Sequence, residues 1–152
     1  VVPEFLSRLK AEAYSADIKP GDVLVTADTV VILDGEILGK PHSRDEALAM
    51  LGKMQSRTHT VVTGVTLSFA DSHPVSFSQK TEVDFDTLSD KEIEFYVDNF
   101  KPYDKAGAYG IQEWIGAAAI IGIRGSFYNV MGLPVHALYL ELKKCGISIG
   151  DI

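Results

Sequence analysis

One carboxylate, Asp28, stands between two apolar, β-branched runs of the sequence, residues 23–26 and 30–33. A carboxylate that leaves the end of a buried strand points into the crevice at the sheet edge where α/β proteins bind ligands. There Asp28 could activate a water molecule as a general base, or hold a divalent metal ion on a phosphate. The alternative is an aspartate that caps a turn between two strands, and the tripeptide at 27–29 alone does not decide.

A lysine, Lys40, follows soon after a hairpin turn that the pair Asp34 and Gly35 predicts. The segment Gly-Glu-Ile-Leu-Gly-Lys-Pro differs from a P-loop, because three residues separate its glycines and Pro41 replaces the Ser or Thr. A P-loop is therefore excluded. What remains is a hairpin that delivers one lysine close in sequence to Asp28, with a solvated turn lysine as the alternative.

A third stretch, residues 104–112, reads Asp-Lys-Ala-Gly-Ala-Tyr-Gly-Ile-Gln. Its small residues let the backbone approach a ligand closely. Lys105 offers a positive charge for a phosphate, Tyr109 a ring, and Gln112 a paired donor and acceptor suited to the edge of a base. A structural turn is the alternative.

A fourth stretch, residues 125–134, places Gly, Ser and Asn before a predicted helix. Free N–H groups at a helix N-terminus could receive an anion there, and a capping loop is the alternative. Two other kinds of site, a zinc site and a serine nucleophile, fit the sequence less well. The four histidines are scattered without cysteine partners, so zinc is not expected, and no Gly-x-Ser-x-Gly elbow is present.

Composition narrows the function classes further. The chain has 152 residues, 46% of them hydrophobic and 23% charged, which predicts one globular domain over residues 1–152. A net charge of −7 argues against a nucleic-acid surface, although an acidic protein can still bind one nucleotide by concentrating a few cations in one cleft. No apolar run is long enough for a membrane helix. Cys145 is the only cysteine, which fits a reducing cytoplasm, where we expect the protein.

The elements that must position these residues follow from periodicity and turn signals. Capping-box patterns begin at Ser43 and Ser89, each with a glutamate three residues later. We expect helices over 3–14, 43–54, 89–97 and 135–144, and strands over 23–26, 30–33, 59–69, 75–85 and 117–123. These elements predict an α/β domain with a mixed β-sheet and flanking helices, in which adjacent strands suggest antiparallel segments.

Taken together, these stretches resemble the Maf family, also called septum-formation-protein homologues. The matching segments are Leu-x-x-Leu-Lys10-Ala, Ala-Asp28-Thr29-Val-Val, Gly-Glu-x-Leu-Gly-Lys40-Pro, Glu46-Ala-x-x-Met-Leu, Thr63-Gly-Val, Asp-Lys105-Ala-Gly-Ala-Tyr-Gly-Ile-Gln112 and Gly125-Ser-x-x-Asn-Val-x-Gly-Leu-Pro134. They run in order across nearly the whole chain. The resemblance implies a two-lobed α/β fold with a central cleft, related to inosine-triphosphate pyrophosphatases.

The resemblance also implies an activity, the hydrolysis of a nucleoside triphosphate to its monophosphate and pyrophosphate, with dTTP and UTP as the substrates of the similar branch. Asp28 would be the catalytic carboxylate and would bind a divalent cation, Mg²⁺ or Mn²⁺. Lys40 and Lys10 would bind phosphate oxygens. Thr29 and Gln112 would stand at positions that choose the base.

The resemblance departs from the family pattern at one end. The family normally begins with a strand and a Ser-x-Ser-Pro-Arg-Arg loop upstream of Val1, so we expect the sequence to be a fragment of a longer protein. A nucleotide-binding regulator of cell division with little or no turnover is the alternative function. A homodimer is one assembly that the resemblance implies, although no patch in the sequence demonstrates it.

Overall fold

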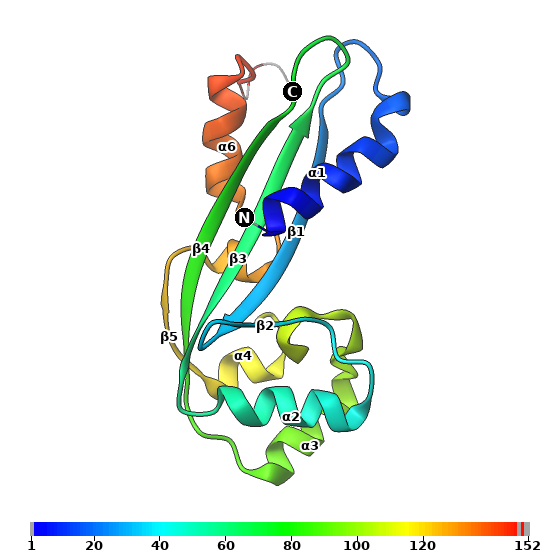
Figure 1. Ribbon diagram of the computed structural model, residues 1–152. Helices are drawn as coiled ribbons and strands as arrows, with labels where there is room; N and C mark the ends of the chain where they lie inside the picture. The colour runs from blue at the N-terminus through cyan, green and yellow to red at the C-terminus, as the bar shows by residue number, and fades with distance from the viewer. Residues whose placement is uncertain (1, 149, 151–152) are drawn as a thin grey trace.

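Long antiparallel strands form the spine of the computed structural model, which describes residues 2–148 and 150 (Figure 1). Strand β3 (Thr58–Ser68) pairs with β4 (Val75–Phe85) on one side and with β1 (Leu24–Leu33) on the other. The short strands β2 (Glu36–Leu38) and β5 (Ile120–Arg124) complete the order β2-β1-β3-β4-β5. The predicted α/β fold is confirmed. All strand pairs among the described residues are antiparallel, however, so the parallel pairing that a mixed sheet would include is not seen there.

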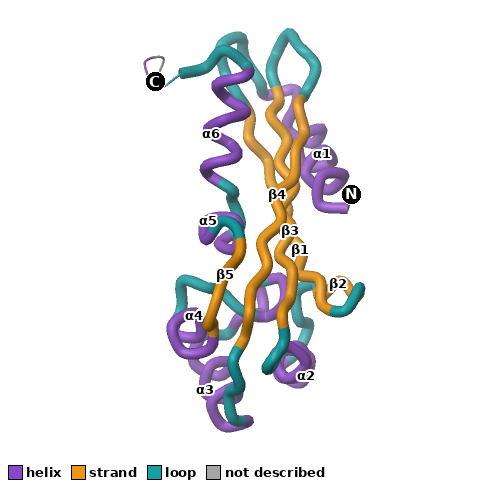
Figure 2. Tube along the Cα trace, turned by 90° about the vertical axis from the view of Figure 1, so that its left-hand side faces the viewer, coloured by secondary structure: helices purple, strands orange, loops and turns teal. Residues whose placement is uncertain are grey.

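The helices gather at two levels along this sheet (Figures 1 and 2). The upper half of the sheet lies between two helices, α1 (Val2–Tyr14) and α6 (Val135–Lys144). The lower end carries α2 (Arg44–Met54), α3 (Asp90–Phe100) and α4 (Trp114–Ala119). Shorter helical turns are η1 (Ser15–Asp17), η2 (Pro102–Asp104), η3 (Ala106–Ala108) and α5 (Phe127–Met131). Within the described part of the chain, no helix is both long and apolar enough to span a membrane.

The main hydrophobic core lies in the lower part, where α2, α3 and the segment before α4 pack against β1, β3 and β4. Its fully buried members include Leu51, Val61, Val83 and Ile115. An N-cap serine begins each of the two helices α2 and α3. The side chain of Ser43 accepts a hydrogen bond from the backbone N–H of Glu46 at 3.1 Å. Ser89 and Glu92 form a complete capping box, so the predicted caps of α2 and α3 are confirmed.

The prediction of two strands interrupted at Ala27-Asp28-Thr29 is wrong. β1 runs without a break, and Asp28 pairs with Gly64 in its middle. The antiparallel ladder with β3 binds the backbone of these polar residues as it binds that of their apolar neighbours, which overrides the low strand propensity of aspartate. Asp28 therefore neither ends a strand nor caps a turn.

The expected strand over residues 117–123 is only partly confirmed. Its first half belongs to the helix α4, and β5 begins at Ile120. Alanines favour a helix, and an apolar run of this length does not distinguish the two structures by periodicity. β5 is an edge strand, and its Ile121 is 70% exposed.

The stretch over residues 125–134 contains a capping loop, and its residues 130–132 line the cavity described below. Ser126 caps α5 by accepting from the backbone N–H of Asn129 at 3.1 Å. Asn129 is fully buried, and its Nδ2 donates to the carbonyl of Gln79 at 3.1 Å and to Thr81 Oγ1 at 2.9 Å. The asparagine therefore fastens α5 to β4, which confirms the capping interpretation of this stretch.

Candidate functional site

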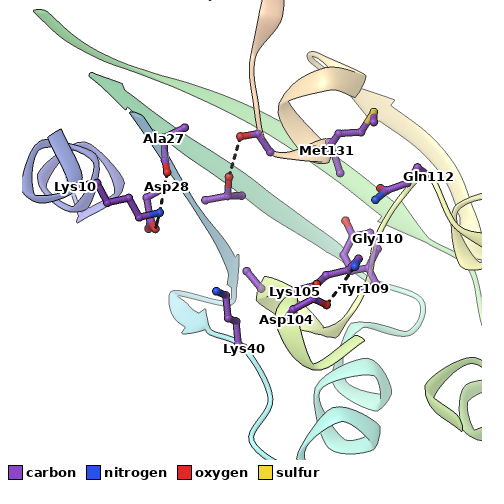
Figure 3. A pocket seen from close by; sticks show the side chains of 14 residues that line it. Lys10, Ala27, Asp28, Lys40, Asp104, Lys105, Tyr109, Gly110, Gln112 and Met131 are labelled. Atoms are coloured by element: carbon purple, nitrogen blue, oxygen red, sulfur yellow. Dashed lines mark hydrogen bonds and ion pairs between the residues drawn. The ribbon is translucent and has the colours of Figure 1, made fainter. Parts of the chain in front are cut away.

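A cavity of about 270 Å³ opens between the upper and lower parts of the molecule. α1, β1, the connection from β2 to α2, the loop before α4 and the end of α5 all contribute to its wall (Figure 3). The six residues predicted from the sequence all line it: Lys10, Asp28, Thr29, Lys40, Lys105 and Gln112. Residues far apart in the chain thus converge on one place.

Lys10 and Asp28 form an ion pair at one end of the cavity (Figure 3). Lys10 Nζ lies 3.0 Å from Asp28 Oδ1 and donates to the carbonyl of Ala27 at 2.9 Å. Lys10 projects from α1, and α1 crosses the face of the sheet on which the Asp28 side chain lies. The Lys10 side chain is 52% exposed, so the pair contributes little to stability, and its ammonium stays accessible to a ligand.

Two further lysines approach from the lower part. Lys105 Nζ lies 3.2 Å from Asp104 Oδ1, and this hydrogen bond lowers the pKa of the Asp104 carboxyl. Lys40 is exposed and has no ion pair in the part of the chain that the structure describes. Three lysines thus face two carboxylates, a local net charge of about +1 in a chain of net charge −7. The cavity therefore suits an anion.

The side of the cavity away from Lys10 also offers neutral groups. Gln112 and Met131 lie on the side away from Lys10 (Figure 3). The Gln112 side chain is exposed and makes no hydrogen bond to any residue that the structure describes, so its amide is available to a ligand. Thr29, by contrast, is engaged with the protein: its Oγ1 lies 2.9 Å from Thr63 Oγ1 and 3.5 Å from the carbonyl oxygen of Gly132.

Some lining residues were not predicted as site residues. Asp104 has a sequence signal, because it is a carboxylate beside Lys105 in the same small-residue loop. Met131 lies in the candidate stretch 125–134, but it ends a short helix that the sequence did not predict. Tyr109, which was expected to offer its ring to a ligand, lines the cavity, but it is only 6% exposed and its ring packs edge-on against Phe85.

The hydroxyl of Tyr109 meets a buried histidine. Tyr109 Oη lies 2.6 Å from His59 Nε2, and the other ring nitrogen, Nδ1, has no partner among the described residues. Burial lowers the pKa of His59 to about 4 and raises that of Tyr109. The histidine is therefore neutral at pH 7 and anchors the loop of residues 105–112 to β3.

This burial predicts a pH dependence of stability. Between pH 6.5 and about 4 an unfolded chain protonates His59 and the folded chain does not, so acidification favours unfolding. We expect the free energy of unfolding to lose up to about 3 kcal/mol through this residue over that range. Urea unfolding at several pH values should show a flatter profile for His59→Gln. The exposed His73→Gln should keep the parent slope, and equal slopes in all three proteins would contradict the prediction.

A divalent cation fits the carboxylates of the cavity only together with a ligand. Among residues 2–148 and 150, no group of three or more His, Cys, Asp or Glu side chains could hold a metal. Asp28 and Asp104 nevertheless both line the cavity. Mg²⁺ typically binds one or two carboxylates and completes its shell with water and substrate phosphates. The donor set thus fits a cation that is shared with a phosphate.

Comparison with known proteins shows what the chain is similar to. The model of a family described as Maf-like protein matches residues 2–145. A dTTP/UTP pyrophosphatase of Porphyromonas gingivalis is 56% identical over 149 residues, which cover 97% of this chain and 74% of the relative. Proteins of the same name from Bacteroides thetaiotaomicron and Flavobacterium psychrophilum are 52% and 46% identical over 143 and 141 residues. These matches cover 94% and 93% of this chain, and 74% and 72% of the respective relatives.

Proposed function

Because the chain belongs to the Maf family, we propose that it is a nucleotide diphosphatase that hydrolyses dTTP and UTP to the monophosphate and pyrophosphate, as one domain over residues 1–152. The observation that carries the proposal is the convergence of the predicted residues on one cavity, whose wall holds three lysines and the free amide of Gln112. A nucleotide needs both kinds of group, because its triphosphate is anionic and its base is a neutral hydrogen-bonding group.

The lysines bind the triphosphate in this proposal. Lys10, Lys40 and Lys105 come from three separate segments, so they can contact oxygens on different phosphates. Their charges also stabilise the negative charge that develops on phosphate oxygens as the bond between the α- and β-phosphates breaks. The pairing of Lys105 with Asp104 and of Lys10 with Asp28 holds both ammonium groups at the cavity wall.

Asp28 is the proposed catalytic carboxylate. It lies beside Lys10 with its side chain 21% exposed, where it can accept a proton from an attacking water molecule. Members of this family are generally metal-dependent, and Asp28 is the residue that would hold the cation, which we propose is Mg²⁺ or Mn²⁺. When bound, such a cation neutralises charge on the phosphate oxygens.

Gln112 and Thr29 are the proposed base-selecting residues. A uracil or thymine edge presents a carbonyl acceptor and an N–H donor, and a Gln amide offers the complementary donor and acceptor. We propose that Thr29 shapes the base site rather than binding the base, because its hydroxyl already contacts Thr63 and the carbonyl oxygen of Gly132.

Replacing Gln112 by Glu tests this assignment. A carboxylate has no N–H to donate to the carbonyl of uracil, so we expect kcat/KM for UTP to fall roughly tenfold to a hundredfold. The value for CTP, which presents an amino donor there, should change much less. Parallel steady-state kinetics with both nucleotides measure the ratio, and Gln79→Glu on β4 outside the cavity is the matched control. An unchanged ratio would remove Gln112 from base selection.

Pyrophosphate release from a panel of nucleoside triphosphates, with Mg²⁺ or Mn²⁺, tests the function itself. Selective turnover of dTTP and UTP is the expected result. Binding of these nucleotides without turnover would instead support the alternative, a nucleotide-binding regulator of cell division.

The homodimer that the resemblance implies remains a prediction. Ile121 on β5 and the neighbouring Phe127 and Tyr128 on α5 expose large apolar side chains, which is typical of surfaces that bind another protein. Sedimentation equilibrium at several concentrations would determine whether the chain self-associates.

A further inference from the structure

A four-residue turn carries Gln112 into the cavity. The backbone N–H of Glu113 donates to the carbonyl of Gly110 at 3.0 Å, which makes Gln112 the third residue of the turn. The orientation of the Gln112 amide therefore depends on how this turn is held.

One hydroxyl group holds both ends of the turn. Tyr96 Oη donates to Glu113 Oε1 at 2.6 Å and accepts from the backbone N–H of Gly110 at 3.0 Å. Tyr96 lies on α3 and is fully buried. Its ring stacks with that of Phe100 at 5.2 Å between centroids, so the position of the hydroxyl is fixed by the core.

The same turn also supports Lys105. A Cβ atom on Gly110 would lie 2.7 Å from Lys105 Cε and 2.9 Å from Glu113 Oε1, so the lysine side chain passes directly over the glycine. Burial and the hydrogen bond to Glu113 raise the pKa of Tyr96, which keeps its hydroxyl protonated as a donor. One buried hydroxyl thus supports a residue proposed for the phosphates and another proposed for the base.

We propose that Tyr96, together with Glu113, is a positioning pair that sets base selectivity through Gln112. This inference rests on the proposed function and deepens it. Neither residue contacts the substrate. The Tyr96 hydroxyl fixes the turn, the turn fixes the amide, and the amide discriminates between uracil and cytosine edges. In a loose turn the Gln112 amide can present its oxygen where its N–H group should be. This weakens the recognition of the uracil carbonyl more than that of the cytosine amino group.

The test compares Tyr96→Phe with the parent protein, because Phe keeps the ring and removes only the hydroxyl. We expect KM for UTP to rise about tenfold with little change in kcat, and the selectivity for UTP over CTP to fall by a similar factor. The matched control is Tyr103→Phe, which removes an exposed hydroxyl of the neighbouring turn η2. Hydrogen exchange at the Gly110 amide should accelerate in Tyr96→Phe alone.

Variants of Glu113 separate positioning from stability. Glu113→Gln keeps an oxygen that accepts from Tyr96, so it should retain the parent selectivity, whereas Glu113→Ala should lose it. Equal losses for UTP and CTP in Tyr96→Phe would show a merely structural role and overturn the proposal, as would an unchanged ratio. Should Tyr96→Phe fail to fold, the two Glu113 variants give the same comparison.

Failure of the proposed function is distinguishable from failure of this inference. A parent protein that releases no pyrophosphate from either nucleotide contradicts the enzyme. Dissociation constants for the α,β-methylene analogues of UTP and CTP still report base selectivity in that case. A weaker preference for the UTP analogue over the CTP analogue in Tyr96→Phe supports the positioning pair. A preference equal to that of the parent protein contradicts it.

Discussion

Replacing Asp28 by Asn is expected to lower kcat for UTP by a factor between about a hundred and ten thousand. Asn has nearly the same shape and keeps an oxygen that can accept the hydrogen bond from Lys10, which is 3.0 Å in the parent. It cannot take a proton from water, and it is a weaker ligand for a divalent cation. The loss therefore falls on the chemical step.

Nucleotide binding should survive this substitution. The lysines that we propose for the phosphates are unchanged, and removal of one negative charge makes the cavity more positive. The dissociation constant for α,β-methylene UTP should thus stay within a few-fold of the parent value or become smaller. Calorimetric titration of parent and variant at one salt concentration measures it, since phosphate contacts are screened by salt.

The control for Asp28→Asn is Asp71→Asn, which changes an exposed aspartate in the connection between β3 and β4. This variant should match the parent in both kcat and binding. If kcat of Asp28→Asn stayed within threefold of the parent, Asp28 would have no part in the chemistry. A parent protein that binds without turnover would instead favour the regulatory alternative.

The parts of the fold that could be predicted are those with local causes. The hairpin between β1 and β2 follows from Asp34 and Gly35, which both adopt left-handed backbone angles, with φ of 50° and 79°. The caps at Ser43 and Ser89 are equally local. In each case a few adjacent residues contain the whole physical reason for the structure.

The parts that could not be predicted depend on contacts between distant segments. Asp28 lies within a strand because β3 pairs with it, and nothing in residues 27–29 reveals that partner. Tyr96 looks like an ordinary apolar residue of a helix, although its hydroxyl holds the turn that carries Gln112. The motif order nevertheless indicated which residues meet in the cavity, because a resemblance across the whole chain carries long-range information that periodicity lacks.

Replacing Gly64 by Ala is the substitution from which we expect the largest loss of stability. Gly64 pairs directly with Asp28 in the sheet, and opposed residues of an antiparallel pair face the same side. That side is covered by the start of α1. An added Cβ would lie 2.2 Å from the backbone N of Glu4 and 2.2 Å from the carbonyl carbon of Pro3. A helix backbone cannot yield as a flexible side chain does, so α1 must move away.

The displacement also reaches the site, because α1 carries Lys10. We expect a loss of about 3 kcal/mol in the free energy of unfolding, and a melting temperature lower by roughly 6–12 °C. Differential scanning calorimetry measures both. The activity of the folded fraction should fall as well, since Lys10 no longer reaches Asp28.

Gly52→Ala is the matched control for Gly64→Ala. Gly52 lies in α2 with no atom within 4 Å of an added Cβ, so alanine should stabilise the protein by up to about 1 kcal/mol through helix propensity. The same substitution is thus expected to raise the free energy of unfolding at Gly52 and to lower it at Gly64. A Gly64→Ala variant as stable as the parent would show that α1 does not rest on the sheet at this point, and the placement of Lys10 beside Asp28 would lose its support.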